Sequence, residues 1–133
     1  MQEIDLDSRL VRLPDADQNF PEVLSYTGDN SHVCLSLNIS ADLGWFRGHF
    51  PDQPVLPGVV QLHWAVLVAQ AYFGMTGVPA EVKRLKYKSI VTPPQILDLT
   101  VSTRAAGEIQ FNFGDAEVQY SEGRLVFAED LEC

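Results

Sequence analysis

The stretch GWFRGHFPDQPVLPGVVQLHWAVLVAQAYF, residues Gly44–Phe73, decides how the rest of the chain can fold. Its first half contains prolines at 51, 54 and 57, and each proline fixes its own φ and keeps the preceding residue extended. Its second half predicts one helix from Pro57 to Phe73, because proline suits the first helical turn. The clearly polar side chains of this helix are Gln61, His63 and Gln70. We therefore expect a stiff loop that leads into a helix buried on nearly every side.

Length and composition favour a single folded domain over residues 1–133, with a poorly defined segment at 1–21. The chain has 133 residues, and 46% of them are hydrophobic, which is enough for a substantial core. The formal net charge of −9 argues against nucleic acid and an anionic membrane surface as partners.

Targeting and redox features favour the cytoplasm. Residues 1–14 are acidic and lack the apolar run of a signal peptide. The apolar run from Pro57 to Phe73 is short for a membrane span and is interrupted by polar residues. The two cysteines, Cys34 and Cys133, fit no zinc spacing and no disulfide framework. We expect a cytoplasmic protein that needs no metal or redox cofactor.

Strands are expected on both sides of the helix. Gly28-Asp29-Asn30 separates two β-prone runs, Glu22–Tyr26 and His32–Ile39, and predicts a hairpin. Glycines at 74 and 77 and a proline at 79 end the helix. The later strand predictions are Val82–Val91, Ile96–Thr103, Ile109–Phe113, Ala116–Tyr120 and Leu125–Ala128, with a hairpin turn at Ser121-Glu122-Gly123 before the last. This order predicts an α+β fold in which a strongly curved antiparallel sheet packs against one helix.

His49 is the first candidate for chemistry, because it sits in the proline-stiffened loop between Gly48 and Phe50. A neutral imidazole held in place can act as a general base. The alternative is a structural histidine that hydrogen-bonds the loop backbone.

The start of the helix is the second candidate, because neither Leu56 nor Pro57 has a side chain that can cap it. The backbone N–H groups of the first helical turn, beginning with that of Gly58, therefore have no capping side chain as acceptor. Because Gly58 has no side chain, a ligand can approach its backbone closely. Such a helix end can bind an anion or a developing oxyanion, and its dipole favours the neutral form of a nearby His49. Water or a neighbouring carbonyl could also satisfy these donors.

His63 lies about one and a half turns into the helix, with Gln70 on the same face and Gln61 on nearly the opposite one. A polar residue on an apolar helix is often a hydrogen-bonded core residue. His63 is also near enough to the helix start to face the same site as His49 and Gly58.

A basic cluster follows the helix and consists of Lys83, Arg84, Lys86 and Lys88. In a regular strand the last three of these would project from one face, opposite Leu85 and Tyr87. The cluster is either a solvated sheet face or a docking surface for an acidic partner.

The segment GHFPDQPVLPGVVQL, Gly48–Leu62, resembles the GHFPGxPVxPGVL signature of the FabA/FabZ-type 3-hydroxyacyl-[acyl-carrier-protein] dehydratases. Three further segments are similar to that family: FRGHFP at Phe46–Pro51, LKYKSIVTPPQILDLTV at Leu85–Val101 and YSEGRLVFAE at Tyr120–Glu129. HWA at His63–Ala65 also resembles the small dehydratase-like proteins of aryl-polyene-type clusters. The resemblance, which covers residues 33–130, implies a hotdog fold, in which a curved sheet wraps one long helix, usually as a dimer.

The resemblance also implies roles for individual residues. His49 takes the position of the family's catalytic histidine, and Gly58 that of the N–H donor to the thioester carbonyl. His63 takes the position of an acidic residue that helps the hydroxyl depart, across the dimer interface, and Asp52 replaces a glycine. Both substitutions depart from the family's pattern. A histidinium could donate the same proton, provided that His63 is charged while His49 is neutral.

Together these features predict a dehydratase that acts on a 3-hydroxyacyl thioester of acyl carrier protein or coenzyme A. The acyl chain would lie in an apolar channel along the helix, the basic cluster would receive the acidic carrier, and the protein would be a homodimer or higher oligomer. Two alternatives remain open: a hotdog acyl thioesterase, and a non-catalytic acyl-binding or partner subunit that has lost the catalytic acid.

Overall fold

The computed structural model describes residues 20–41 and 55–128 of the chain. The strands and the helix in this part are β1 Glu22–Gly28, β2 His32–Ile39, α2 Gly58–Phe73, β3 Pro79–Tyr87, β4 Gln95–Ala105, β5 Glu108–Gly114 and β6 Gln119–Phe127. All neighbouring strands are antiparallel, and their order in the sheet is β1-β2-β4-β5-β6-β3.

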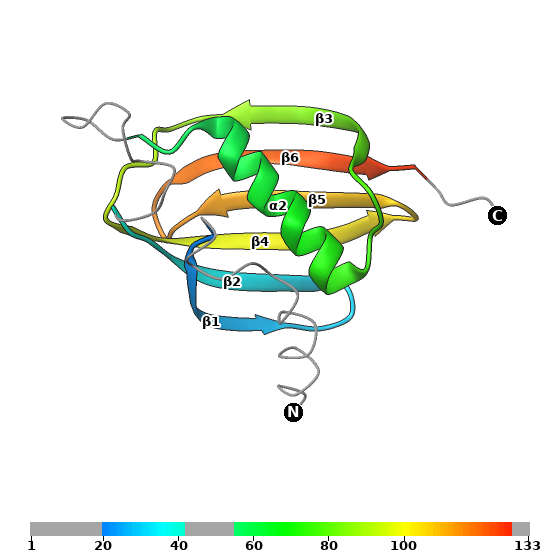
Figure 1. Ribbon diagram of the computed structural model, residues 1–133, viewed down its shortest axis with the longest axis horizontal. Coiled ribbons are helices and arrows are strands. Elements are labelled where there is room, and N and C mark those ends of the chain that lie inside the picture. Colours follow the sequence, from blue (N-terminus) through cyan, green and yellow to red (C-terminus); the bar gives the residue numbers. More distant parts are fainter. Residues whose placement is uncertain (1–19, 42–54, 129–133) are drawn as a thin grey trace.

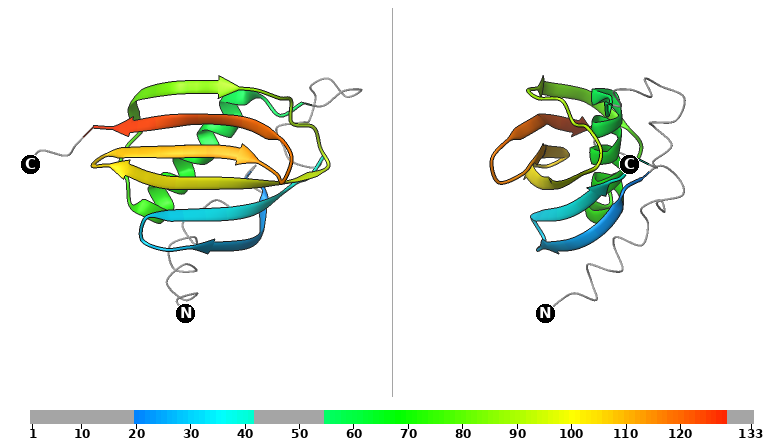
Figure 2. Two further views of the ribbon diagram at one scale, coloured as in Figure 1. Left: turned by 180° about the vertical axis from the view of Figure 1, so that it is seen from behind. Right: turned by 90° about the vertical axis from the view of Figure 1, so that its left-hand side faces the viewer.

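The sheet curves round α2, the one helix among the described residues (Figures 1 and 2). Helix α2 crosses one face of the sheet, and β3, which follows it in the chain, lies at the edge farthest from β1. This arrangement confirms the α+β class and the curved antiparallel sheet around one long helix that the hotdog resemblance implies.

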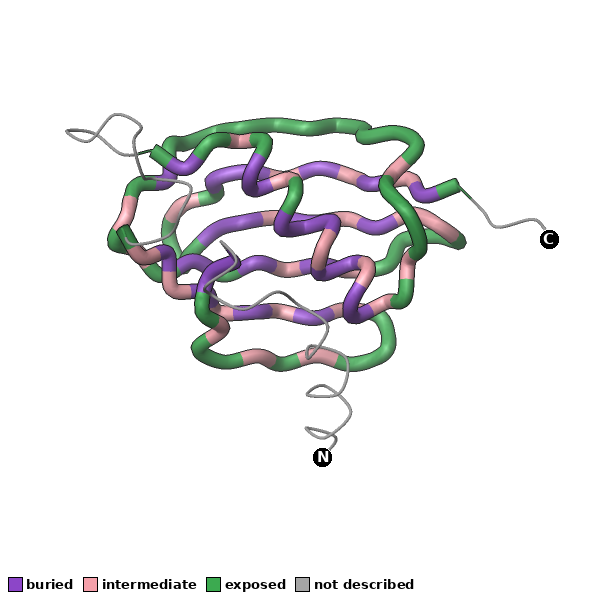
Figure 3. The backbone as a smooth tube through the Cα atoms, in the orientation of Figure 1, coloured by how far each residue is buried: buried purple, intermediate pink, exposed green. Residues whose placement is uncertain are grey.

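Regular alternation along the strands builds the core between sheet and helix. In β2 every second residue is fully buried, and Leu35 pairs with Leu99 of β4. From the helix, the fully buried Trp64 packs edge-on against Phe20, with ring centroids 5.8 Å apart. Figure 3 shows the resulting layer of buried residues on the central strands and along the helix.

Helix α2 begins and ends where the sequence predicts. Pro57 precedes it in an extended conformation, with φ −62° and ψ 146°. Gly74 ends it in the left-handed region, with φ 71°, and the Gly74 N–H donates to the carbonyl of Ala69. The β1–β2 hairpin is also confirmed, whereas β3 begins at Pro79, earlier than predicted.

The expectation that the helix is buried on nearly every side is wrong. Val59 is 68% exposed and His63 is exposed, whereas Trp64 and Val68 on the other side are fully buried. The reason is that the sheet covers α2 on one side only, and none of the described residues covers Val59 and His63.

The hairpin turn predicted at Ser121-Glu122-Gly123 is also wrong, because the strand β6 runs straight through it. The turn lies earlier, at Asp115, whose carboxylate accepts two backbone hydrogen bonds. Gly123 serves close packing instead, since a Cβ there would lie 2.9 Å from Cε2 of Phe111. This glycine is required by a neighbouring ring and not by a turn.

Candidate functional site

The described part of the candidate site is the start of α2. The Pro57 carbonyl accepts hydrogen bonds from the N–H groups of Val60 and Gln61, at 3.1 and 3.3 Å, and no side chain caps the helix. Among the described residues, no acceptor is hydrogen-bonded to the N–H of Gly58 or Val59. Two donors at the positive end of the helix dipole can therefore bind an oxygen atom. This arrangement can stabilise negative charge that develops on a carbonyl oxygen.

Gly58 is half-buried under the ring of Tyr87, the last residue of β3. A Cβ at Gly58 would lie 2.6 Å from both Cε1 and Cζ of Tyr87, so any larger residue would force the ring to move. Partial burial raises the pKa of the Tyr87 phenol, a group that is protonated at neutral pH even without this shift. The sequence does not identify Tyr87 as a site residue. It predicts only that Tyr87 lies beside Leu85 on the inner face of a strand.

Gln61 fixes the position of the helix start. Its buried side-chain amide donates to the Leu56 carbonyl at 3.3 Å and accepts a hydrogen bond from the Ser121 hydroxyl of β6 at 2.7 Å. The Leu56 N–H in turn donates to the Val91 carbonyl at 2.8 Å. These bonds tie the chain before α2 to the sheet, and they show that Gln61 faces the core.

His63 lies on the exposed side of α2, one turn after Val59. In the part of the chain that the structure describes, His63 is therefore no core histidine. Gln70 has a structural task, since its amide donates to the Gly77 carbonyl at 2.6 Å and holds the loop after the helix. Of the three predicted catalytic residues, Gly58 and His63 lie in the first two turns of α2, and their joint role stays a prediction.

His49 and Asp52 lie outside the described residues, so the position of His49 beside the helix start stays a prediction. The described ranges contain no group of three or more His, Cys, Asp or Glu side chains that could hold a metal ion. They also contain no helix with the length and hydrophobicity that crossing a membrane requires.

The basic cluster lies on the face of the sheet opposite α2. Lys83 pairs with Arg124 of β6 and Lys86 pairs with Glu122, and both partners project from the outer face of β6. The register shifts between these pairs because β3 contains an extra residue, a β-bulge. Lys83 therefore joins the outer face, contrary to the prediction for a regular strand.

A family model described as ApeI-like, ApeI dehydratase, matches residues 25–124, which include the start of α2 and the basic cluster. The chain belongs to the ApeI-like dehydratase family. The family model, the FabZ relatives and the ApeI:P structure are all named as dehydratases, a class of lyase.

Two relatives and one solved structure show how far this ApeI-like chain resembles known dehydratases. It is 30% identical over 102 residues to the 3-hydroxyacyl-[acyl-carrier-protein] dehydratase FabZ of Clostridium beijerinckii, covering 68% of this chain and 72% of the relative. The FabZ of Natranaerobius thermophilus is 32% identical with the same coverage. The dehydratase heterocomplex ApeI:P from Xenorhabdus doucetiae matches with a TM-score of 0.75 at 25% identity, covering 83% of this chain and 99% of that chain. These matches confirm the resemblance to FabZ-type dehydratases.

Proposed function

We propose that this ApeI-like protein is a dehydratase that converts a 3-hydroxyacyl thioester on acyl carrier protein into the trans-2-enoyl thioester, in fatty-acid or polyene-type biosynthesis. The observation that carries the proposal is the uncapped start of α2, where Gly58 offers its N–H and His63 lies on the exposed side of the helix. The FabZ relatives are named for this reaction. We also propose a cytoplasmic location, because the two isolated cysteines suit a reducing compartment.

Each residue of the proposed site has one task. Neutral His49 takes a proton from the substrate's Cα, and the negative charge moves to the thioester oxygen, which the Gly58 N–H stabilises. The Cβ–O bond then breaks as the Cα–Cβ double bond forms. The hydroxyl leaves as water with a proton from His63 of the partner subunit. This step requires His63 to be charged while His49 is neutral, and the positive end of the helix dipole favours a neutral His49.

A second subunit fits the open side of α2 and the free edge of the sheet. β3 is exposed along nearly its whole length, and among the described strands it pairs only with β6. Val59 and Tyr87 leave apolar surface beside this edge. We therefore propose a homodimer or higher oligomer in which one subunit completes the other's site. The related ApeI:P structure is a heterocomplex, so a similar second chain is the alternative partner.

The acidic acyl carrier would dock on the basic cluster, Lys83, Arg84, Lys86 and Lys88, because opposite charges speed association and orient the partner. The acyl chain would lie along the apolar helix, and the reaction uses no metal or redox cofactor. A coenzyme A thioester could replace the carrier-bound substrate, since the reacting atoms are the same.

The deciding experiment measures elimination of water from 3-hydroxyacyl carrier substrates by the purified protein, followed by mass spectrometry. The substitutions His49→Ala and His63→Gln should each lower the rate at least about 100-fold, as is typical for the loss of a general acid or base. His32→Ala is the matched control, because His32 is the remaining histidine of the chain and begins β2, outside the proposed site. This variant should keep the wild-type rate. A fully active His49→Ala variant would remove His49 from the mechanism. Lack of turnover on every carrier and coenzyme A substrate would overturn the dehydratase proposal.

The presence of His63 in place of the family's acid favours one other function, a non-catalytic acyl-binding or partner subunit. In that case the wild type binds acyl carrier without turnover, and His63→Glu gains dehydration. Measuring thiol release in the same reactions tests the thioesterase alternative, because hydrolysis frees a thiol whereas dehydration leaves the thioester intact.

A further inference from the structure

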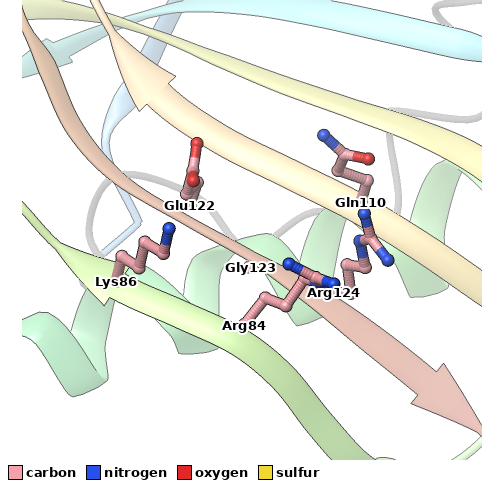
Figure 4. Close-up of a pocket in the computed structure, with 6 residues that line it drawn as sticks. All are labelled: Arg84, Lys86, Gln110, Glu122, Gly123 and Arg124. Atoms are coloured by element: carbon pink, nitrogen blue, oxygen red, sulfur yellow. The ribbon is translucent and has the colours of Figure 1, made fainter.

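The outer face of the sheet carries a hollow of about 130 Å³ between β3, β5 and β6. Its lining residues are Arg84, Lys86, Gln110, Glu122, Gly123 and Arg124 (Figure 4). The hollow lies on the opposite side of the sheet from α2, so it is separate from the start of the helix.

The bulge in β3 shapes this hollow. Arg84 and Leu85 together face the single residue Gly123 across the register shift. Arg84 has a φ of 52°, in the left-handed region where glycine is favoured and a side chain costs energy. The bulge places Leu85 beside Gly123, where it stays 37% exposed, while the side chain of Arg84 turns outward.

The charges around the hollow do not cancel. Glu122 is its one carboxylate, and this carboxylate forms an ion pair with Lys88, whose Nζ lies 3.6 Å away. Lys86 is the cross-strand neighbour of Glu122. In the described part of the chain, neither Arg84 nor Arg124 has a carboxylate within ion-pair distance. Figure 4 shows their two guanidinium groups close to each other and away from Glu122. Two cations thus converge without a counter-charge, in a chain whose net charge is −9.

We propose that this hollow binds a phosphate-type oxyanion between the guanidinium groups of Arg84 and Arg124. Each guanidinium offers paired N–H donors that match two oxygens of a phosphate, and the Gln110 amide, which Figure 4 shows next to Arg124, adds a further donor. A dianion neutralises both arginines, which a single carboxylate does not. Its binding would also offset the left-handed conformation of Arg84, a conformation that persists where surrounding structure or function requires it. The site does not depend on the proposed dehydratase function.

The experiment is a calorimetric titration of the full chain with inorganic phosphate at constant ionic strength, with chloride as the balancing anion, because surface charge effects depend on salt. We expect saturable binding of one phosphate per chain. The substitutions Arg124→Gln and Arg84→Gly should each weaken it at least about tenfold, the effect of losing one charge-assisted pair of hydrogen bonds. Lys83→Gln is the matched control, because it removes the same charge from the same strand outside the hollow, and it should change the Kd less than about twofold.

Two results would overturn the proposal. One is the lack of saturable phosphate binding, and the other is equal weakening by all three substitutions, which would indicate a diffuse positive surface. If Arg124→Gln fails to fold, Arg84→Gly still tests the proposal. Glycine suits the left-handed backbone at position 84, so Arg84→Gly should have a melting temperature equal to or above that of the wild type.

A second arm of the titration identifies the source of the anion. If glycerol 1-phosphate binds more tightly than inorganic phosphate, the occupant is a phosphate monoester. Equal or tighter binding of inorganic phosphate identifies the free ion.

Discussion

Gly58 meets two demands at once at the start of α2. Among the described residues, no acceptor is hydrogen-bonded to its N–H, and its Cα packs against the ring of Tyr87. The first demand comes from the proposed chemistry and the second from packing. A substitution at Gly58 therefore affects stability as well as any reaction, and the two effects must be measured separately.

We expect Gly58→Ala to lower the free energy of unfolding by about 1–3 kcal/mol, the usual effect of adding a methyl group where there is no room. The new Cβ would lie 2.6 Å from two ring atoms of Tyr87, so the ring must move. Urea unfolding of the wild type, Gly58→Ala, Tyr87→Ala and the double variant measures this coupling. If Gly58→Ala destabilises the protein equally when Tyr87 is alanine, the ring is not the cause.

At the scale of elements, the β1–β2 turn depends on one carboxylate. Asp29 Oδ1 accepts hydrogen bonds from the N–H groups of Ser31 and His32, at 2.8 and 3.0 Å. The Asp29 carbonyl also accepts a hydrogen bond from the Tyr72 hydroxyl at 2.7 Å, which joins the turn to the end of α2. The hydrogen bond from the Ser31 N–H is the main reason why the pKa of Asp29 falls from 3.8 to about 2.

This lowered pKa gives the turn a pH dependence with a definite sign. The folded state holds the Asp29 proton less tightly than the unfolded state does, so the stabilisation is present above pH 3.8 and is lost as the pH falls to about 2. The variant Asp29→Asn has no carboxylate at position 29 to protonate. We therefore expect its free energy of unfolding to fall less between these pH values than that of the wild type. Urea midpoints at a series of pH values measure the difference. Parallel curves for the two proteins would contradict this account.

The bulge in β3 is an element whose sequence conflicts with its conformation. Arg84 has a φ of 52°, which costs a side-chain-bearing residue roughly 1–2 kcal/mol and costs glycine almost nothing. Arg84→Gly should therefore raise the free energy of unfolding by about 1 kcal/mol, measured by urea unfolding in phosphate-free buffer. Arg84→Ala removes the same charge but keeps the Cβ, so it should bring no such gain. An equal gain in both variants would mean that charge repulsion, and not the backbone, is relieved.

At the scale of the whole molecule, the exposed side of α2 and the edge strand β3 are two neighbouring surfaces that the described residues leave uncovered. Val59 on the helix is 68% exposed, and Tyr87 at the end of β3 is 48% exposed. An unpaired edge and an exposed apolar side chain beside it are features of a surface that binds another chain.

We expect the wild type to have a mass in solution that is a multiple of 14.8 kDa, and Val59→Lys to shift it toward the single chain. A lysine on this side of the helix adds a charge where the proposed partner excludes water. Leu24→Lys is the matched control, because Leu24 is 46% exposed on β1 at the far edge of the sheet, and it should keep the wild-type mass. Sedimentation equilibrium measures both variants. A monomeric wild type would contradict the proposed assembly.

The helix and the fold class could be predicted because their signals are local. Pro57 and Gly74 mark the ends of α2, and the alternation in His32–Ile39 marks a half-buried strand. Gly123 was misread as a turn signal, because its cause is the ring of Phe111 on a neighbouring strand. Tyr87 was missed for the same reason, since its partner Gly58 is distant in the chain.

The sequence by itself determined the central helix, its uncapped start and the curved antiparallel sheet around it. These features follow from proline and glycine conformations, from side chains that cannot cap, and from apolar spacing, all of which act over a few residues. Only the tertiary structure decided that Tyr87 covers Gly58, that residues 20–41 and 55–128 leave one side of α2 open, and that the bulge gathers Arg84 and Arg124 around one hollow. These features depend on which strands lie side by side and in which register, and long-range packing sets both.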